Sequence, residues 1–102
     1  MSAAPRFDEL IHAPTRLSIV ALLAASEWAD FTFVRDSLGM SDSALSKQVS
    51  ALEQAGYVTV RKTGAGRNRR THIRLSPLGR RAFGGHAAAL QQIIASAGTL
   101  AP

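Results

Sequence analysis

Cysteine is absent from this chain of 102 residues, which excludes disulfide bonds, thiolate zinc sites and cysteine nucleophiles. Long apolar runs are absent too. The longest candidate, Leu17–Ala25, is interrupted by Ser18 and is shorter than the roughly 18 residues that cross a bilayer. Met1–Arg6 has no apolar stretch like that of a secretory signal. These absences predict a cytoplasmic protein with no membrane partner.

Acidic residues are missing from one segment of the chain. Arg61–Arg81 contains eight of the twelve Lys and Arg residues and no Asp or Glu, whereas the remainder carries all seven acidic residues. The net charge is +5. Solubilising surfaces usually mix the two signs of charge, so a segment of one sign indicates a polyanionic partner. Aromatic residues make up only 6% of the chain, which is few for stacking on single-stranded bases.

The length and the apolar content of 46% predict one globular domain, residues 1–102, of the α+β, mainly α class. We expect a core at 7–83, a dimerisation helix at 84–98 and a frayed tail at 99–102. Helices are predicted at Arg6–His12, at Pro14–Ser26, which is the expected central core helix, and at Phe33–Leu38, with a connector at Trp28–Phe31 that holds at most a short pair of strand residues.

A helix at Ser41–Gly56 organises this prediction. Leu45, Val49 and Leu52 recur at i, i+4 and i+7, so they form one apolar face. Ser41 or Asp42 can cap its start, and Gly56 stands where a left-handed residue can end it. The preceding helix is expected to be capped by Thr32 and stopped by Gly39. Two helices joined by a short turn containing glycine are typical of a helix-turn-helix.

The apolar period changes from 3.6 to two after Gly56. Val58 and Val60 alternate with polar residues, as do Thr71, Ile73 and Leu75, which predicts an antiparallel hairpin with an arginine-rich tip. Ser76 and Pro77 then start a helix at Leu78–Phe83. Gly84 and Gly85 are expected to break or kink it before a second helical segment, His86–Ala97.

The order of three helices, a basic hairpin and a further helix is that of a winged helix-turn-helix. The segments Ile11–Leu23, Asp30–Val58 and Lys62–Arg80 resemble the small MarR-like winged-helix transcriptional regulators, and Pro14–Ala24 is loosely similar to ArsR-type sensors, whose thiolate ligands are absent here. The resemblance implies a homodimeric, sequence-specific DNA binder that represses or tunes transcription. It leaves open whether a small-molecule effector exists.

The candidate DNA-binding residues lie on the polar face of the Ser41–Gly56 helix and on the hairpin. Gln48 suits an adenine edge, and Lys47 suits guanine or a phosphate. Serine hydroxyls and a helix N-terminus suit phosphate oxygens, and arginines on a hairpin tip suit a narrow minor groove. The full predicted set is Thr32, Ser41, Asp42, Ser43, Ser46, Lys47, Gln48, Ser50, Arg61, Lys62, Arg67, Asn68, Arg69 and Arg70. The alternative is a solvated amphipathic helix beside a soluble loop.

An apolar stripe near the C-terminus predicts a dimer, because in a monomer it would be an exposed patch. The predicted interface comprises Phe7, Leu10, Ile11, Leu90, Ile93, Ile94 and Ala97. A two-fold dimer would present two reading helices about 34 Å apart, so we expect its DNA site to be nearly palindromic. The alternative is a helix that folds back on its own domain. A protein-interaction module without DNA contact is the alternative function. No acid–base pair predicts catalysis, and no spacing of the three histidines predicts a metal or another cofactor.

Overall fold

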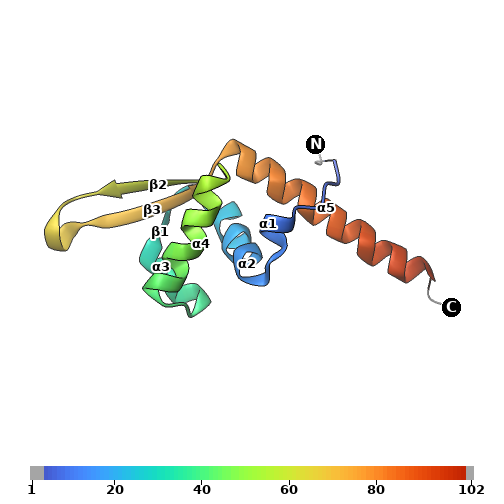
Figure 1. The fold of residues 1–102 in the computed structure, drawn as a ribbon, viewed down its shortest axis with the longest axis horizontal. Helices are drawn as coiled ribbons and strands as arrows, with labels where there is room; N and C mark the ends of the chain where they lie inside the picture. Colours follow the sequence, from blue (N-terminus) through green and yellow to red (C-terminus); the bar gives the residue numbers. More distant parts are fainter. Residues whose placement is uncertain (1–3, 101–102) are drawn as a thin grey trace.

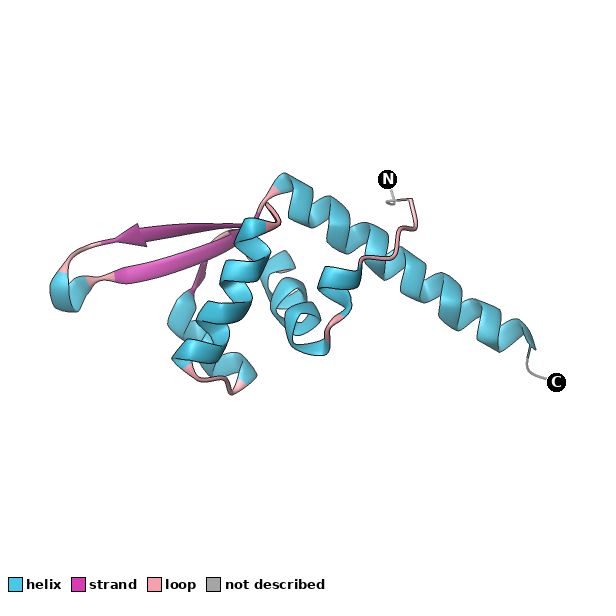
Figure 2. Ribbon diagram, viewed as in Figure 1, coloured by secondary structure: helices cyan, strands magenta, loops and turns pink. Residues whose placement is uncertain are grey.

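The computed structural model describes residues 4–100, with side chains through residue 97, as five helices and a three-stranded antiparallel sheet (Figures 1 and 2). The helices are α1 (Glu9–His12), α2 (Pro14–Ala24), α3 (Phe31–Leu38), α4 (Asp42–Gln54) and α5 (Pro77–Leu100). The strands are β1 (Ala29–Asp30), β2 (Val58–Thr63) and β3 (Arg70–Leu75), and a 3-10 turn, η1 (Gly66–Asn68), forms the hairpin tip. The predicted α+β fold is confirmed.

The core lies where α2, α3 and α4 meet one face of the sheet. Ile19, Val20 and Leu23 of α2 are fully buried, as are Leu45 of α4 and Ile73 of β3. Because α2 is apolar around most of its circumference, it contributes to the core on several sides, as a central helix should. The sequence period therefore identified the correct inward faces.

The α3–turn–α4 unit differs from the prediction at its first cap. Asp30, and not Thr32, caps α3, because the Asp30 carboxylate accepts the Thr32 backbone N–H at 2.8 Å and the helix begins at Phe31. Asp30 stands one position before the helix in extended conformation, which is the geometry a cap requires. The glycine stop is confirmed: Gly39 adopts a left-handed φ of 63°.

The sheet has the order β1–β3–β2, and the hairpin formed by β2 and β3 is the wing. Register pairs Val58 with Leu75 and Thr63 with Arg70, so the wing is longer than the alternating residues had indicated. The short β1 pairs only with Ile73 and His72 of β3. Beyond that pairing, the wing extends away from the helices (Figure 1).

The predicted break at Gly84 and Gly85 is wrong, since α5 is one helix from Pro77 to Leu100. Arg6 donates its backbone N–H to the Gly85 carbonyl at 2.9 Å, and a Cβ on Gly85 would lie 3.2 Å from the Ala4 carbonyl oxygen. Glycine therefore lets the N-terminal segment lie against α5, and packing outweighs the cost in helix propensity. The expected frayed tail is also corrected in part, because α5 extends through Leu100; residues 101–102 lie outside the described part.

The first helix is a single turn, and the burial of one of its residues corrects the predicted dimer interface. Asp8 caps α1 through its carboxylate, which accepts the Ile11 backbone N–H at 3.0 Å. Ile11 is 0% exposed inside its own chain, so it cannot contribute to a surface between two copies of this fold. Of the two large aliphatics of this one-turn helix, Ile11 is buried and Leu10 is only partly buried, and the spacing of Phe7, Leu10 and Ile11 did not distinguish the inward side from the outward one.

A junction of four residues joins α4, the wing and α5. The Ser76 hydroxyl donates to the Gly56 carbonyl at 2.5 Å, and the Ser76 backbone N–H donates to the Tyr57 carbonyl at 2.9 Å. The same hydroxyl caps α5 by accepting the Gly79 N–H at 3.0 Å. Both ends of the wing are thereby fixed to the start of α5.

The molecule is elongated, with extents of 60 × 27 × 20 Å. The wing projects from one end, and the second half of α5 projects from the other (Figure 1). No helix in the described part of the chain is long and apolar enough to span a membrane.

Candidate nucleic-acid interface

The face of α4 that points away from the core is polar and exposed. Leu45, Val49 and Leu52 are buried, which confirms the predicted period. The exposed residues Ser43, Ser46, Lys47 and Ser50 lie on the remaining circumference. Aliphatic packing thus fixes one side of the helix and presents short hydrogen-bonding groups and one cation on the other.

A groove of about 700 Å³ runs between α4 and the inner face of the wing. Ser46 and Ser50 line it from α4, and Lys62 lines it from β2. The structure therefore brings these three predicted residues together from two elements. Asp42 and Glu53 also line the groove, so its surface has both signs of charge.

The wing tip gathers the predicted arginines around a second hollow. Arg67, Asn68, Arg69 and Arg70 are all exposed. A cavity of about 280 Å³ lies between three of these residues, the arginines, and the start of α3, where Thr32 lines it. Thr32 and the tip, separated by more than thirty residues, thus share one concave surface.

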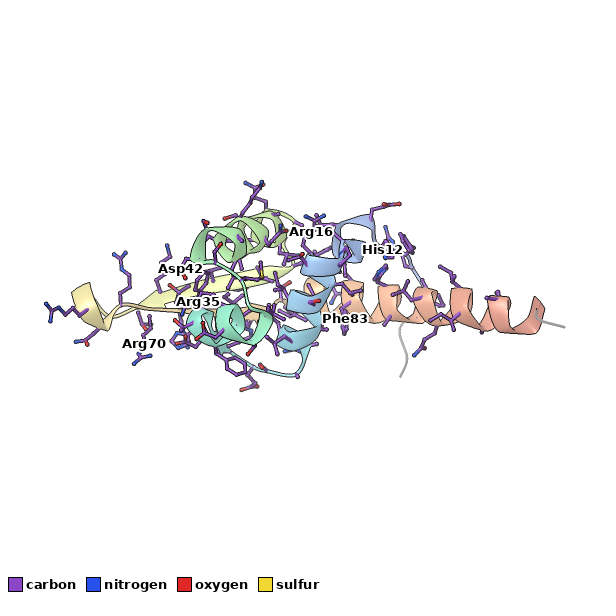
Figure 3. The ribbon with its side chains drawn as sticks, turned by 90° about the horizontal axis from the view of Figure 1, so that it is seen from below. His12, Arg16, Arg35, Asp42, Arg70 and Phe83 are labelled. Atoms are coloured by element: carbon purple, nitrogen blue, oxygen red, sulfur yellow. The ribbon has the colours of Figure 1, made fainter. Side chains whose placement is uncertain are left out.

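Several predicted residues already have partners within the chain. The Ser41 hydroxyl caps α4 by accepting the Ala44 N–H at 3.1 Å. Asp42 forms a 2.7 Å ion pair with Arg35, and the two lie side by side in Figure 3. Gln48 is half-buried. Arg35 also bonds Asp36 at 2.9 Å, and its hydrogen bonds to Asp36 and then Asp42 raise its pKa above the ordinary value.

Arg16 is a candidate site residue that the sequence did not indicate. Its Nε donates to the Leu10 carbonyl at 2.6 Å, and its Nη1 donates to the Gln48 side-chain oxygen at 3.2 Å. Arg16 therefore orients a predicted base-reading side chain from α2. The two residues are 32 positions apart, and no periodicity links them.

Arg61 and Lys62 were predicted as one pair of phosphate contacts, but they lie on opposite faces of the wing. Lys62 lines the groove beside α4, and successive strand residues alternate faces. Arg61 instead stacks on Trp28, with its guanidinium carbon 4.2 Å from the ring centroid. The prediction did not apply the alternation of strand residues to this pair, and the stacking partner of Arg61 had no sequence signal.

A buried polar cluster joins α1, α5 and Tyr57, which lies between α4 and β2. The His86 side chain is 0% exposed, and its Nδ1 accepts the Asp8 backbone N–H at 3.0 Å. The other ring nitrogen of His86, Nε2, lies 3.3 Å from Nδ1 of His12. Burial, and then the nearby His12, lower the pKa of His86. Tyr57 donates to the Asp8 carboxylate at 2.5 Å, which raises the pKa of Tyr57.

Hydrogen bonds in the same cluster stabilise the ionised form of the Asp8 carboxylate. Burial alone would raise the pKa of Asp8, but hydrogen bonds from Tyr57 and from backbone N–H groups outweigh it and lower the pKa. The described residues include no group of three His, Cys, Asp or Glu that could hold a metal ion.

The predicted dimer residues are exposed to very different degrees. Ile93 and Ile94 are 56% and 70% exposed on the projecting half of α5, and Phe7 is 40% exposed. Leu90 is half-buried and Ala97 is exposed. Leu10 packs in part against the core of its own domain. The structure therefore leaves the α5 stripe, Leu90, Ile93, Ile94 and Ala97, uncovered except at Leu90.

The three helices α2, α3 and α4, with a turn between α3 and α4 and a basic hairpin after α4, define a winged helix-turn-helix protein. The chain belongs to the winged helix DNA-binding domain family, whose model matches residues 15–94. The predicted fold and family resemblance are confirmed.

Similar proteins agree with this assignment. An uncharacterised protein of Methanocaldococcus jannaschii is 28% identical over 74% of this chain and 82% of its own length. Among solved structures, a transcriptional regulator homologue from Pyrococcus horikoshii has a TM-score of 0.81 at 24% identity, covering 87% of this chain and 88% of its own.

Two further solved structures represent related regulators. The homodimeric winged helix-turn-helix domain Mb0332 of Mycobacterium bovis, a possible ArsR-family regulator, has a TM-score of 0.64 at 26% identity, covering 86% of this chain and 73% of its own. The zinc-responsive MarR-family member ZitR of Lactococcus lactis has a TM-score of 0.65 at 15% identity, covering 98% and 68%. The MarR-like architecture predicted from the sequence is therefore confirmed at the level of the fold.

Proposed function

We propose that this chain is a homodimeric transcriptional regulator that binds double-stranded DNA at a specific, near-palindromic site and represses the adjoining promoter. One observation carries the proposal: the polar face of α4 lies beside a wing whose tip arginines Arg67 and Arg69 have no acidic partner among residues 4–97. Free guanidinium groups beside an exposed polar helix match the chemistry of a duplex.

In this proposal α4 lies in the major groove. Lys47 is exposed at the middle of the face and contacts guanine or a phosphate, while Ser43, Ser46 and Ser50 contact phosphates and base edges. Gln48 reads an adenine edge from the side of the helix that faces Arg16. The exposed N-terminal turn of α4, with Ser41 and Asp42, lies near the DNA backbone.

The wing tip enters the adjacent minor groove, where the negative potential favours guanidinium groups. Thr32 lies in the same hollow as the tip arginines and adds a phosphate contact at the start of α3. Lys62 contacts the backbone from the groove beside α4. The tip supplies affinity, and α4 supplies most of the sequence preference.

The second copy covers the α5 stripe. Exposed Ile93 and Ile94 on a projecting helix favour burial against an identical face, with Phe7, Leu90 and Ala97 at the same seam. The solved Mb0332 domain, which is described as homodimeric, supports this arrangement. A dimer bound across a promoter excludes other proteins from it, which is the basis for repression. The site of action is the cytoplasm, where such a promoter is accessible.

The proposal is tested by selecting bound duplexes from a random pool and measuring affinity at several salt concentrations. Replacing Arg67, Arg69 and Arg70 with Ala removes about three phosphate contacts, so the slope of log K against log salt should fall by about 2.7. Arg81→Ala, at an exposed position of α5, is the charge control and should leave that slope unchanged. Lys47→Ala should change the selected sequence more than the affinity.

A wild-type chain that retards no duplex, yet retains a stable protein partner, would overturn the proposal in favour of a protein-interaction module. An unchanged sequence preference in Lys47→Ala would remove α4 from the reading role.

The dimer is tested separately by sedimentation. Ile94→Glu places a charge in the stripe and should shift the chain to a monomer, with weaker binding to a two-half-site duplex. Gln92→Glu adds the same charge on the opposite side of α5 and should leave the dimer intact. Equal dimerisation of both variants would place the interface elsewhere.

A further inference from the structure

The face of the sheet that points away from α4 carries a row of basic side chains. Register pairs Thr63 with Arg70, Arg61 with His72, and Thr59 with Arg74. Their neighbours Val58, Ile73 and Leu75 are buried, and Val60, Lys62 and Thr71 line the groove beside α4, so these three pairs occupy the opposite face. We call these six residues, together with Trp28, the outer face.

Trp28 lies between two of these arginines. The guanidinium carbon of Arg61 is 4.2 Å from the indole centroid, and that of Arg74 is 5.2 Å from it. Arg80 holds the loop before Trp28, because it donates to the Ala24 carbonyl at 3.3 Å and to the Ser26 carbonyl at 3.0 Å. The stack therefore restricts both arginines before any ligand binds.

The two stacked arginines keep their hydrogen-bonding capacity. Within residues 4–97, neither Arg61 nor Arg74 forms an ion pair, whereas Arg70, nearer the tip, lies 3.7 Å from Asp30. Each guanidinium has five N–H donors in a planar fork that suits phosphate. Consecutive pairs on one face are about 7 Å apart along the strands, so the row spans about 14 Å from tip to base.

Apolar anchoring is scarce on the outer face. Apart from the Trp28 ring, its side chains are those of Thr59, Thr63, His72 and the arginines, and the Asp30 carboxylate lies beside His72 at the edge of the sheet, 3.7 Å from Arg70. Protein-binding surfaces have apolar centres surrounded by polar rims, and this face lacks one. Threonine hydroxyls and arginines without acidic partners are instead typical of contacts to a nucleic-acid backbone. The row is also continuous with the tip, which the proposed function places on DNA.

We propose that the outer face binds the phosphate backbone of the DNA that flanks the half-site on the side of the wing, with Arg61 and Arg74 as the contacting residues and Trp28 as their positioning residue. This inference rests on the proposed function, since the same duplex reaches the outer face past the wing tip. The flanking contact adds affinity without adding sequence preference.

The test compares two duplexes with the full chain and with the double variant Arg61→Ala/Arg74→Ala. The short duplex ends at the edge of the footprint that the double variant protects, and the extended duplex adds about ten base pairs, one helical turn, on each side. Loss of two phosphate contacts should lower the salt slope by about 1.8 on the extended duplex only. Wild type should then lose about twelvefold more affinity than the variant between 50 and 200 mM salt.

Two further variants separate this contact from a general loss of charge or of folding. Arg67→Ala/Arg69→Ala removes two arginines from the tip and should lower the slope equally on both duplexes. Arg61→Lys/Arg74→Lys keeps the charges and should retain most of the slope on the extended duplex. Trp28→Phe should weaken binding to the extended duplex while leaving the short duplex unaffected.

The chain has one tryptophan, so its fluorescence reports on the outer face directly. The extended duplex should shield Trp28 from iodide quenching, and the short duplex should not. Two results together would overturn the inference and leave the proposed function standing. The salt slopes of wild type and the double variant would be equal on the extended duplex, and iodide would quench Trp28 equally in the presence of the extended and the short duplex. Shielding by a polyglutamate peptide but not by the extended duplex would assign the face to an acidic protein. Failure to bind either duplex would overturn both.

Discussion

Gly79→Ala should destabilise the protein although alanine favours helices. Gly79 is in the first turn of α5, and a Cβ there would lie 2.1 Å from the Tyr57 carbonyl oxygen, where ordinary contact starts at 3.4 Å. The two backbones would have to separate by roughly 1 Å, because the interior has no free space to absorb the methyl group. That movement disrupts the 2.9 Å bond from the Ser76 N–H to the same carbonyl.

The magnitude follows from three terms. Alanine gains about 1 kcal/mol in helix propensity, overpacking costs about 1–3 kcal/mol, and the lost hydrogen bond costs about 1 kcal/mol. We expect Gly79→Ala to lower the free energy of unfolding by about 2 kcal/mol, measured by urea denaturation, and to lower the midpoint of thermal unfolding by about 10 °C.

The matched control is Gly85→Ala, in the same helix. There the nearest atoms are the Ala4 carbonyl oxygen at 3.2 Å and the Arg6 Cβ at 3.4 Å, so a small movement of the N-terminal segment relieves the contact. This variant should stay within about 1 kcal/mol of wild type, because the propensity gain offsets the contact. If Gly79→Ala proved as stable as wild type, the close approach of Tyr57 to α5 would be refuted.

Three further predictions concern the buried cluster and α4. Because the pKa of His86 is lowered in the fold, its stability contribution is present above the ordinary value of 6.5 and is lost as pH falls below it. The free energy of unfolding measured with urea should therefore fall by at most about 1.4 kcal/mol per pH unit below 6.5, and His86→Gln should flatten that slope. Tyr57→Phe should cost about 1 kcal/mol in urea denaturation and raise the pKa of Asp8, seen by NMR titration; an unchanged Asp8 pKa would refute the hydrogen bond. Arg16→Ala should release Gln48 and broaden the sequences recovered from a random duplex pool, and an identical set of sequences would contradict the positioning role.

Local pattern predicted most of this fold because its elements obey it. The aliphatics of α4 recur at helical spacing and are buried, and the glycine after α3 adopts the left-handed conformation that a stop requires. The failure at Gly84 and Gly85 has a tertiary cause. The backbone of Arg6 approaches Gly85 from 79 positions away, and propensity contains no term for such a contact.

The candidate site likewise has residues that local patterns identified and pairings that only tertiary packing determines. Exposure of Lys47 and of the tip arginines follows from periodicity and from the position of the turn, so the sequence identified them. The pairings of Arg16 with Gln48, Arg35 with Asp42 and Arg61 with Trp28 join residues from different elements. Each depends on how two elements pack, which single-residue patterns do not encode.

The junction at Ser76 relates the DNA-reading end to the proposed dimer end. Ser76 ties the end of α4 and the base of the wing to α5, and α5, at 1.5 Å per residue, extends about 36 Å from there. Because one continuous helix separates the junction from the exposed Ile94, a small rotation at Ser76 would, in the proposed dimer, become a large displacement of one reading helix relative to the other. A break at Gly84 and Gly85 would have decoupled them. The glycines instead let the N-terminal segment lie along α5, so in the proposed dimer a continuous α5 would make the spacing between the two reading helices depend on the junction.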